Sequence, residues 1–262
     1  NTVKKYAELV PEPTVPKLPA EPTGKGPLDG IRVLDLGLAI AGPFGCQLLG
    51  DMGAEVIKMN TLWDSYWHKC HIAAMANRNK RSFAVMLKHP KGMEALKRLI
   101  ATCDVVQHNM RYPATQRLGL DYETLKKEFP SLVYCHSRGF EEGPRKNLPG
   151  NDQTGACLSG IQHEDGALYT GREDTFPIWS LTSLGDTGNG FLTAVGICNA
   201  LMEREKTGKG TFIDVSMLDC QIAILENAIA RYLAKNEIPK PMGSRHPSIA
   251  PFEAFKTKDS YI

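Results

Sequence analysis

One carboxylate, Asp186, stands among glycines in the stretch 181–190, LTSLGDTGNG, just ahead of a long apolar pattern. Apolar residues recur at helical spacing from Phe191 to Met202, which places Asp186 near the first turn of a helix predicted to end at about Glu205. The dipole and the backbone N–H groups at that end of a helix favour an ionised carboxylate. Asp186 is therefore either an ordinary helix N-cap or a reactive carboxylate that the glycines leave open to a ligand.

Other catalytic chemistries find little support. The first strand-to-helix turn, 37–45, lacks the G-x-G-x-x-G pattern of dinucleotide binding, and no G-x-x-x-x-G-K-[ST] phosphate loop occurs. The histidines show no H-E-x-x-H or other metal-ligand spacing, and the G-x-S-x-G motif of serine hydrolases is absent. We therefore expect carboxylate chemistry, with neither a metal nor a nicotinamide cofactor.

Two residue clusters lie between the second and third predicted strands. The aromatic residues Trp63, Tyr66 and Trp67 could form a wall for a cofactor or a cationic substrate, or simply the small core of their own loop. The basic run 77–81, NRNKR, suits phosphate groups but is also typical of a solvated surface. The sequence leaves both alternatives open for each cluster.

The elements that must position these residues alternate between strand and helix. This alternation predicts an α/β fold with a doubly wound, mainly parallel sheet covered by helices, which places ligands beyond the carboxyl ends of its strands. A further short helix, capped by Asn151 or Asp152, is expected to end at Leu158. Strands are predicted at 31–36, 55–59, 82–87, 104–108, 132–137 and 211–216, and the other helices at 43–52, 90–101, 122–128, about 186–205 and 217–234.

Composition describes a globular protein. The chain has 262 residues, of which 42% are hydrophobic and 23% charged, and its formal net charge of +2 gives no field that would steer nucleic acid. Its 7 cysteines are scattered without a C-x-x-C pair, as in reduced cytosolic proteins. No apolar run approaches the ~20 residues of a membrane span. We expect a cytoplasmic protein with neither nucleic-acid nor membrane partners.

Taken together, several motifs resemble the class III coenzyme A transferases, the family of formyl-CoA transferase, carnitine CoA-transferase and α-methylacyl-CoA racemase. The resemblance implies a Rossmann-like large domain and CoA or an acyl-CoA as substrate. It also implies that Asp186 is the nucleophile, which attacks the thioester to give an acyl-aspartyl anhydride and then an aspartyl-CoA thioester. The motifs are PLDGIRVLDL at 27–36, AGP at 41–43, GAEVIK at 53–58, NKRS at 79–82, GD at 185–186 and TGKGTFIDVSM at 207–217.

The resemblance also implies a set of binding residues. The CoA groove would be lined by Ala39, Ile40, Ala41, Gly42, Pro43, Asn77, Arg78, Lys80, Arg81, Asn109 and Arg117. The acid substrates would meet Trp63, Tyr66, Trp67, Asn151 and Asp152. Ile40 stands where formyl-CoA transferases have a glutamine, so the match is closer to carnitine CoA-transferase, and the aromatic loop suggests a betaine or sulfonium acid as acceptor, such as carnitine or dimethylsulfoniopropionate.

Two alternatives to a transferase stay open. The racemases of the family use a histidine at the position of Asn151, and because an amide cannot act as a general base the racemase is the weaker alternative. The chain could also be a catalytically silent CoA-binding or dimerisation unit of a fusion protein.

The domain prediction comes from proline content and from the resemblance. We expect a proline-rich linker at 1–26, a large domain at 27–217, a linking helix and linker at 218–245 and the start of a truncated small domain at 246–262. A fragment of a longer polypeptide is therefore expected. Family members form interlocked homodimers, and the N-terminal linker suggests instead the second unit of a tandem fusion, as in dimethylsulfoniopropionate CoA-transferase/lyases.

Overall fold

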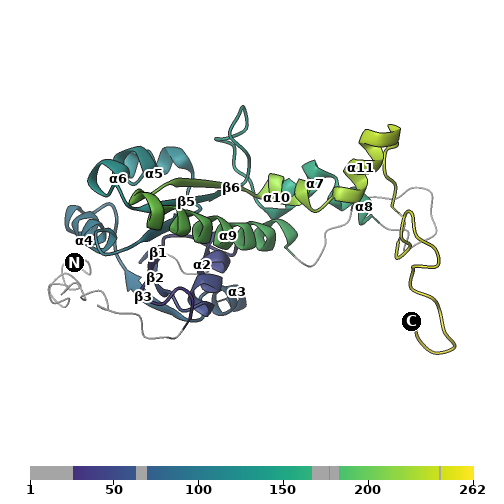
Figure 1. Ribbon diagram of the computed structural model, residues 1–262, viewed down its shortest axis with the longest axis horizontal. Coiled ribbons are helices and arrows are strands. Elements are labelled where there is room, and N and C mark those ends of the chain that lie inside the picture. The colour runs from purple at the N-terminus through teal and green to yellow at the C-terminus, as the bar shows by residue number, and fades with distance from the viewer. Residues whose placement is uncertain (1–25, 63–69, 167–176, 178–182, 242) are drawn as a thin grey trace. The chain divides into compact units, whose positions relative to one another are not determined.

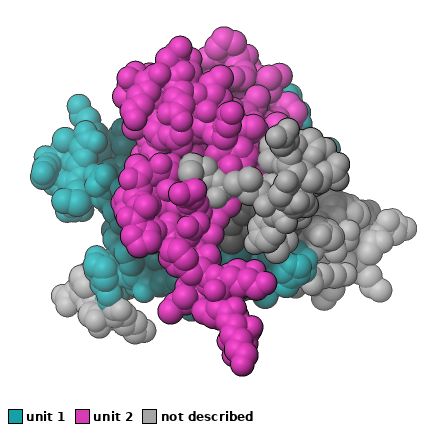
Figure 2. All heavy atoms as spheres, turned by 90° about the vertical axis from the view of Figure 1, so that its right-hand side faces the viewer, with its two compact units in different colours: residues 1–138, 189–215 teal, residues 139–188, 216–262 magenta. Residues whose placement is uncertain are grey.

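The computed structural model describes residues 26–62, 70–166, 177, 183–241 and 243–262. The chain divides into two compact units, residues 1–138 with 189–215 and residues 139–188 with 216–262, which Figure 2 distinguishes by colour. The boundaries predicted for the large and small domains stay a prediction.

In the first unit, the described residues form a six-stranded sheet in the order β3-β2-β1-β4-β5-β6. The pairs β1–β2, β1–β4, β2–β3 and β4–β5 are parallel, so the predicted doubly wound α/β sheet is confirmed. The strand order reverses between β1 and β4, where folds of this kind bind ligands beyond the carboxyl ends. The strands are β1 Arg32–Asp35, β2 Glu55–Asn60, β3 Lys80–Ala84, β4 Val105–His108, β5 Val133–Arg138 and β6 Phe212–Ser216.

Helices cover both faces of this sheet (Figure 1). One face carries the main apolar core, where Leu34, Val106 and Tyr134 pack with Leu96 of α4 and Leu125 of α6. Alternate strand residues point to the opposite face, which α2 covers. The helices of this unit are α2 Ala41–Asp51, α3 His71–Ala76, α4 Pro90–Ile100, α5 Tyr112–Leu118, α6 Tyr122–Glu128 and most of α9 Leu184–Thr207.

The face beneath α2 and α9 is held by buried hydrogen bonds. Gln107 Nε2 on β4 donates to Ser137 Oγ at 3.1 Å, and Ser137 Oγ lies 2.9 Å from Thr193 Oγ1 on α9. The two helices approach closely at glycines, because a Cβ on Gly45 would lie only 2.8 Å from the carbonyl oxygen of Gly190. The packing thus fixes where α2 begins relative to the sheet.

In the second unit, the described residues form helices and one isolated antiparallel bridge between Lys256 and Tyr261. Its helices are α7 Asp152–Ser159, α8 Ile161–Glu164, α10 Met217–Ala223, α11 Glu226–Lys235 and the first residues of α9. Asn151 caps α7 by accepting the N–H of Thr154 at 2.9 Å, as predicted. A Cβ on Gly155 of α7 would lie 2.2 Å from Gln221 Oε1 of α10, so glycine permits this close packing.

Two predicted elements are wrong in their bounds. The third strand lies at Lys80–Ala84 rather than 82–87, because its neighbour β2 ends at Asn60 and the carbonyl of Met86 already accepts the N–H of His89 in a turn. The single helix predicted at 217–234 is two helices, separated where the N–H of Leu225 bonds the carbonyl three residues back. The short helices α3, α5 and α8 were not predicted.

The structure can be compared with the expectations about the cysteines and about membrane-spanning helices. All seven cysteines carry free thiols, and Cys46, Cys135 and Cys220 are buried. Across the described ranges, no helix combines the length and the apolar character that crossing a membrane requires.

Candidate active site

Asp186 lies in the first turn of α9, as predicted, but it is not at the N-cap position of that helix. The helix already begins at Leu184. The acceptor for its first N–H groups is Asp152, whose Oδ1 lies 2.6 Å from the N–H nitrogen of Gly185 and 3.2 Å from that of Asp186. The N-cap interpretation of Asp186 is therefore wrong, because a residue more than thirty positions upstream supplies the capping carboxylate.

Gln221 supports this arrangement from α10. Its side-chain Nε2 donates to the carbonyl oxygen of Asp152 at 3.0 Å and lies 3.5 Å from Asp152 Oδ1. Gln221 is fully buried and Asp152 is 8% exposed. A Cβ on Gly185 would lie 2.5 Å from Gln221 Nε2, so a side chain directly before Asp186 would displace the Gln221 amide. Sequence reasoning missed Gln221, although a lone amide in the apolar helix 217–223 was a signal for it.

This geometry favours a charged carboxylate at position 186, on a backbone that is held in place. The amino end of a long helix carries partial positive charge, which stabilises anions within the first turn. Asp186 is partly exposed there, and its backbone is held in place by the hydrogen bond to Asp152. Asp152 was predicted to bind substrate, whereas its carboxylate is engaged with backbone. Substrate binding by Asn151 and Asp152 stays a prediction.

In the other unit, the structure brings together the predicted turn after β1 and Asn109, which follows β4. Asn109 holds Leu38 with two hydrogen bonds, accepting its N–H at 2.8 Å and donating to its carbonyl at 2.7 Å. Ala39 has a φ of +61°, which turns the chain sharply into α2. The buried residues Ala41, Gly42 and Pro43 then form the first turn of α2. The amino end of α2 thus lies where the strand order reverses, a position that suits an anionic ligand.

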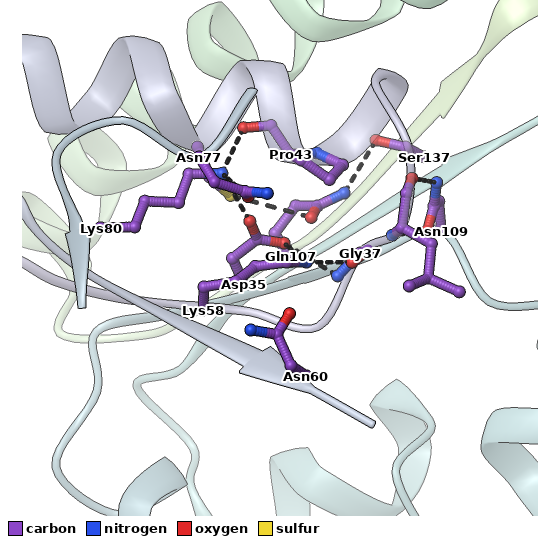
Figure 3. A network of polar contacts seen from close by, with 12 residues as sticks. Asp35, Gly37, Pro43, Lys58, Asn60, Asn77, Lys80, Gln107, Asn109 and Ser137 are labelled. Atoms are coloured by element: carbon purple, nitrogen blue, oxygen red, sulfur yellow. Dashed lines mark hydrogen bonds and ion pairs between the residues drawn. The ribbon is translucent and has the colours of Figure 1, made fainter. Parts of the chain in front are cut away.

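A buried ionic network supports this turn from below (Figure 3). Lys80 Nζ lies 2.7 Å from Asp35 Oδ2 and donates to the carbonyl of Pro43 at 2.7 Å. Lys58 approaches the other carboxylate oxygen at 3.4 Å and also donates to the carbonyl of Gly37. Two ammonium groups therefore share one carboxylate and connect β1, β2 and β3 to both ends of the turn.

Charge and burial oppose each other in this network. Burial opposes ionisation of Asp35, but the ammonium groups of Lys58 and Lys80 outweigh it and hold the pKa of the carboxyl below its usual value. Burial lowers the pKa of Lys58, although Asp35 partly restores it. The Lys80 side chain is 1% exposed and engaged inside the protein. Its contacts with Asp35 and the carbonyl of Pro43 indicate that Lys80 stabilises the turn after β1 from inside the protein.

The rest of the predicted basic run lies elsewhere. Arg78 Nη2 lies 2.6 Å from Asp51 Oδ2 at the carboxyl end of α2, and Arg81 pairs with Glu55 at the start of β2. Both pairs lie at the amino edge of the sheet, opposite the turn after β1. Asn77 Oδ1 lies 3.4 Å from Lys80 Nζ. Arg117 is exposed on α5. Binding of CoA by these residues stays a prediction.

The structure bears only in part on the predicted aromatic loop and on the expected absence of a metal site. Trp63, Tyr66 and Trp67 lie outside the described residues. Within the described ranges, no cluster of three or more His, Cys, Asp or Glu side chains could hold a metal ion.

The sequence of this chain is similar to those of known proteins. The model of CoA-transferase family III matches residues 28–262. Succinyl-CoA:glutarate CoA-transferase from Mus musculus is 37% identical over 90% of this chain and 56% of its own length. Acetyl-CoA:oxalate CoA-transferase from Acetobacter aceti is 36% identical over 92% of this chain and 63% of its own length. The chain thus spans between half and two thirds of the length of these relatives.

A solved structure agrees with these matches. A CAIB/BAIF family protein from Brucella suis superposes with a TM-score of 0.79 at 34% identity, over 90% of this chain and 65% of that protein.

Proposed function

Since the chain belongs to CoA-transferase family III, we propose that the protein of which it is part moves CoA from an acyl-CoA thioester to a carboxylic acid. The observation that carries this proposal is Asp186 in the first turn of α9, held by the contact between its backbone N–H and Asp152. We propose Asp186 as the nucleophile. The names of three similar proteins, CoA-transferases for glutarate, oxalate and mesaconate, support the same reaction class.

The proposed reaction passes through two kinds of covalent intermediate on Asp186, an anhydride and a thioester. A carboxylate oxygen of Asp186 attacks the donor carbonyl, the C–S bond breaks and CoA leaves as thiolate, giving an acyl-aspartyl anhydride. The thiolate then attacks the aspartyl carbonyl of the anhydride, which releases the donor acid as carboxylate and leaves an aspartyl-CoA thioester. The acceptor carboxylate and the thiolate repeat these two steps in reverse, so acyl-CoA is formed and Asp186 is regenerated.

The chain's own groups would contribute binding and electrostatics. The amino end of α9 stabilises the attacking carboxylate as an anion. The backbone N–H groups of Gly185 and Asp186 are bonded to Asp152, so donors for the oxyanion that develops at the carbonyl carbon must come from other groups. The high-energy anhydride requires a site from which water is excluded. For CoA itself, we propose the turn from Ala39 to Pro43 with Asn109 as the binding element, since it lies beside the amino end of a helix.

The acceptor acid is proposed from the relatives. Glutarate, oxalate and mesaconate in their names are dicarboxylates, and we propose a dicarboxylate as acceptor for this protein. The betaine or sulfonium acid predicted from Trp63, Tyr66 and Trp67 stays the alternative. A panel of acceptors with one acyl-CoA donor separates the two, because a preference for carnitine or dimethylsulfoniopropionate over glutarate would contradict the dicarboxylate proposal.

The experiment for the reaction uses the full-length protein. After incubation with an acyl-CoA, hydroxylamine should modify the peptide that contains Asp186, and mass spectrometry would locate the adduct. Asp186→Asn should abolish both adduct and CoA transfer, whereas Asp165→Asn, at an exposed carboxylate of the same unit, should preserve both. Transfer that persists in Asp186→Ala would refute the proposal.

Two alternatives to a transferase would give different experimental results. A racemase would exchange the α-proton of a 2-methylacyl-CoA with deuterated water, and a silent binding unit would bind CoA without forming an adduct. We also propose, from the family resemblance, an interlocked homodimer or a tandem-fused pseudo-dimer, which the mass of the native full-length protein in solution would test.

A further inference from the structure

Two buried histidines that lie opposite each other on neighbouring strands contact the backbone of Met110, one at its N–H and one at its carbonyl. His108, the last residue of β4, accepts the N–H of Met110 on its Nδ1 at 3.2 Å. His136, on β5, lies with its Nε2 at 2.9 Å from the carbonyl oxygen of Met110. The two imidazole rings stack with their centroids 4.5 Å apart, and both side chains are almost fully buried. The peptide groups on either side of Met110 are therefore fixed by side chains rather than by a strand partner.

The hydrogen bonds around His108 define its neutral tautomer. The hydroxyl of Tyr134 donates to the carbonyl of Leu120 at 2.8 Å, so its oxygen must accept from His108 Nε2, which lies at 2.7 Å. With the proton on Nε2, the Nδ1 atom of His108 is free of hydrogen and can accept from Met110. His136 must carry a proton on Nε2 to donate to the carbonyl of Met110. Among the described residues, its buried Nδ1 has no hydrogen-bond partner.

Asn109 lies between His108 and Met110 in the chain, and its side chain contacts the backbone of Leu38. Its amide makes both hydrogen bonds to the Leu38 backbone, so the turn after β1 depends on where Asn109 is placed. Asn109 is in turn flanked by His108 and Met110. A continuous series of short contacts therefore runs from the histidine pair to the turn at the amino end of α2.

We propose that His108 and His136 are positioning residues for ligand binding, which hold Met110 so that Asn109 keeps the turn after β1 in its binding conformation. The inference rests on the proposed function, because the ligand proposed for that turn is CoA. Neither histidine needs to touch CoA, and neither takes part in the transfer chemistry.

The arrangement requires both rings to be neutral. A proton on Nδ1 of His108 would face the N–H of Met110, and a proton on Nδ1 of His136 would place a buried charge without an acceptor among the described residues. Burial and the neighbouring imidazole hold the pKa of His108 well below its usual value. Burial lowers the pKa of His136 to about 4. The other titratable or charged groups that face the pair are Tyr134, Tyr112, whose ring centroid lies 5.8 Å from that of His136, and Arg138, which pairs with Asp214.

The test compares two substitutions at one position in the full-length protein. His136→Gln keeps an N–H donor that can reach the carbonyl of Met110, whereas His136→Phe keeps the ring volume and removes the donor. Calorimetric titration with CoA at pH 7.5 should show binding weakened about 5- to 10-fold by His136→Phe and less than about 2-fold by His136→Gln, as expected for the loss of one hydrogen bond. Ile100→Val, at the last residue of α4 in the apolar core, is the control, since it should lower the melting temperature without changing CoA affinity.

The outcomes separate the inference from the proposed function. If the wild-type protein binds CoA and His136→Phe binds it equally well despite a lower melting temperature, the histidines are merely structural and the inference is overturned. If the wild-type protein binds no CoA, the proposed function falls and the inference falls with it. If His136→Phe does not fold, the pH dependence of CoA binding by the wild-type protein tests the proposal instead. CoA affinity of the wild-type protein should fall as the pH is lowered from 6 towards 4, and a constant affinity over that range contradicts the proposal.

Discussion

The titration of His136 predicts a loss of stability in mild acid that can be assigned to one side chain. Burial lowers its pKa from 6.5 to about 4 in the folded protein. Between these two values the unfolded chain binds a proton that the folded protein does not, so stability rises with pH across this window and is lost as the pH falls. A shift of this size corresponds to about 3 kcal/mol of unfolding free energy in full, of which about 2 kcal/mol is lost by pH 5.

The assay is urea unfolding followed by circular dichroism at several pH values from 7.5 to 5. His136→Gln removes the titrating ring, so its stability should depend less on pH than that of the wild-type protein. Between pH 7.5 and pH 5, the wild-type protein should lose about 2 kcal/mol more unfolding free energy than the variant. His163→Gln, at an exposed histidine, should follow the wild-type curve. Parallel curves for wild-type and His136→Gln would show that the buried ring does not titrate as the structure requires, and the reasoning would be refuted.

Three further predictions concern the two candidate sites. Asp35→Asn leaves two buried ammonium groups without a carboxylate and should lower the unfolding free energy by about 3–5 kcal/mol. Lys58→Met keeps one ion pair intact and should cost much less, so equal losses in urea unfolding would contradict the network. Asp152→Ala should cost about 1–3 kcal/mol and slow adduct formation, while Asp152→Asn, which keeps an acceptor oxygen, should retain most of the rate in the trapping assay. Gly42→Ala would place a Cβ 2.0 Å from a buried amide nitrogen and should cost about 1–3 kcal/mol in thermal unfolding, whereas Gly50→Ala in the same helix should be nearly neutral.

The sheet could be predicted because its strands are apolar and separated by helices of ordinary length. The strand from Val105 to His108 and the helix from Tyr122 to Glu128 follow from local pattern alone. The length of β3 could not be predicted, because it is set by where β2, its neighbour among the described strands, ends. Likewise, the break at Leu225 has no proline or glycine to mark it.

The candidate site was predictable in its types of residue but not in its contacts. The position of Asp186 near a helix start follows from the apolar spacing after it. The capping by Asp152 joins residues more than thirty positions apart, and no local pattern carries such a pairing. For the same reason the run from Asn77 to Arg81 could be recognised as basic, while the inward direction of Lys80 could not.

The hydrogen bonds of Asp152 have a consequence for the whole catalytic cycle of the proposed reaction. When Asp186 becomes an anhydride or a thioester, its negative charge disappears. The helix keeps an anionic acceptor nevertheless, because the carboxylate that binds the N–H groups of Gly185 and Asp186 belongs to a residue that is never acylated. The start of α9 therefore has the same electrostatic anchor in every covalent state, and turnover need not disturb the fold around the reacting side chain.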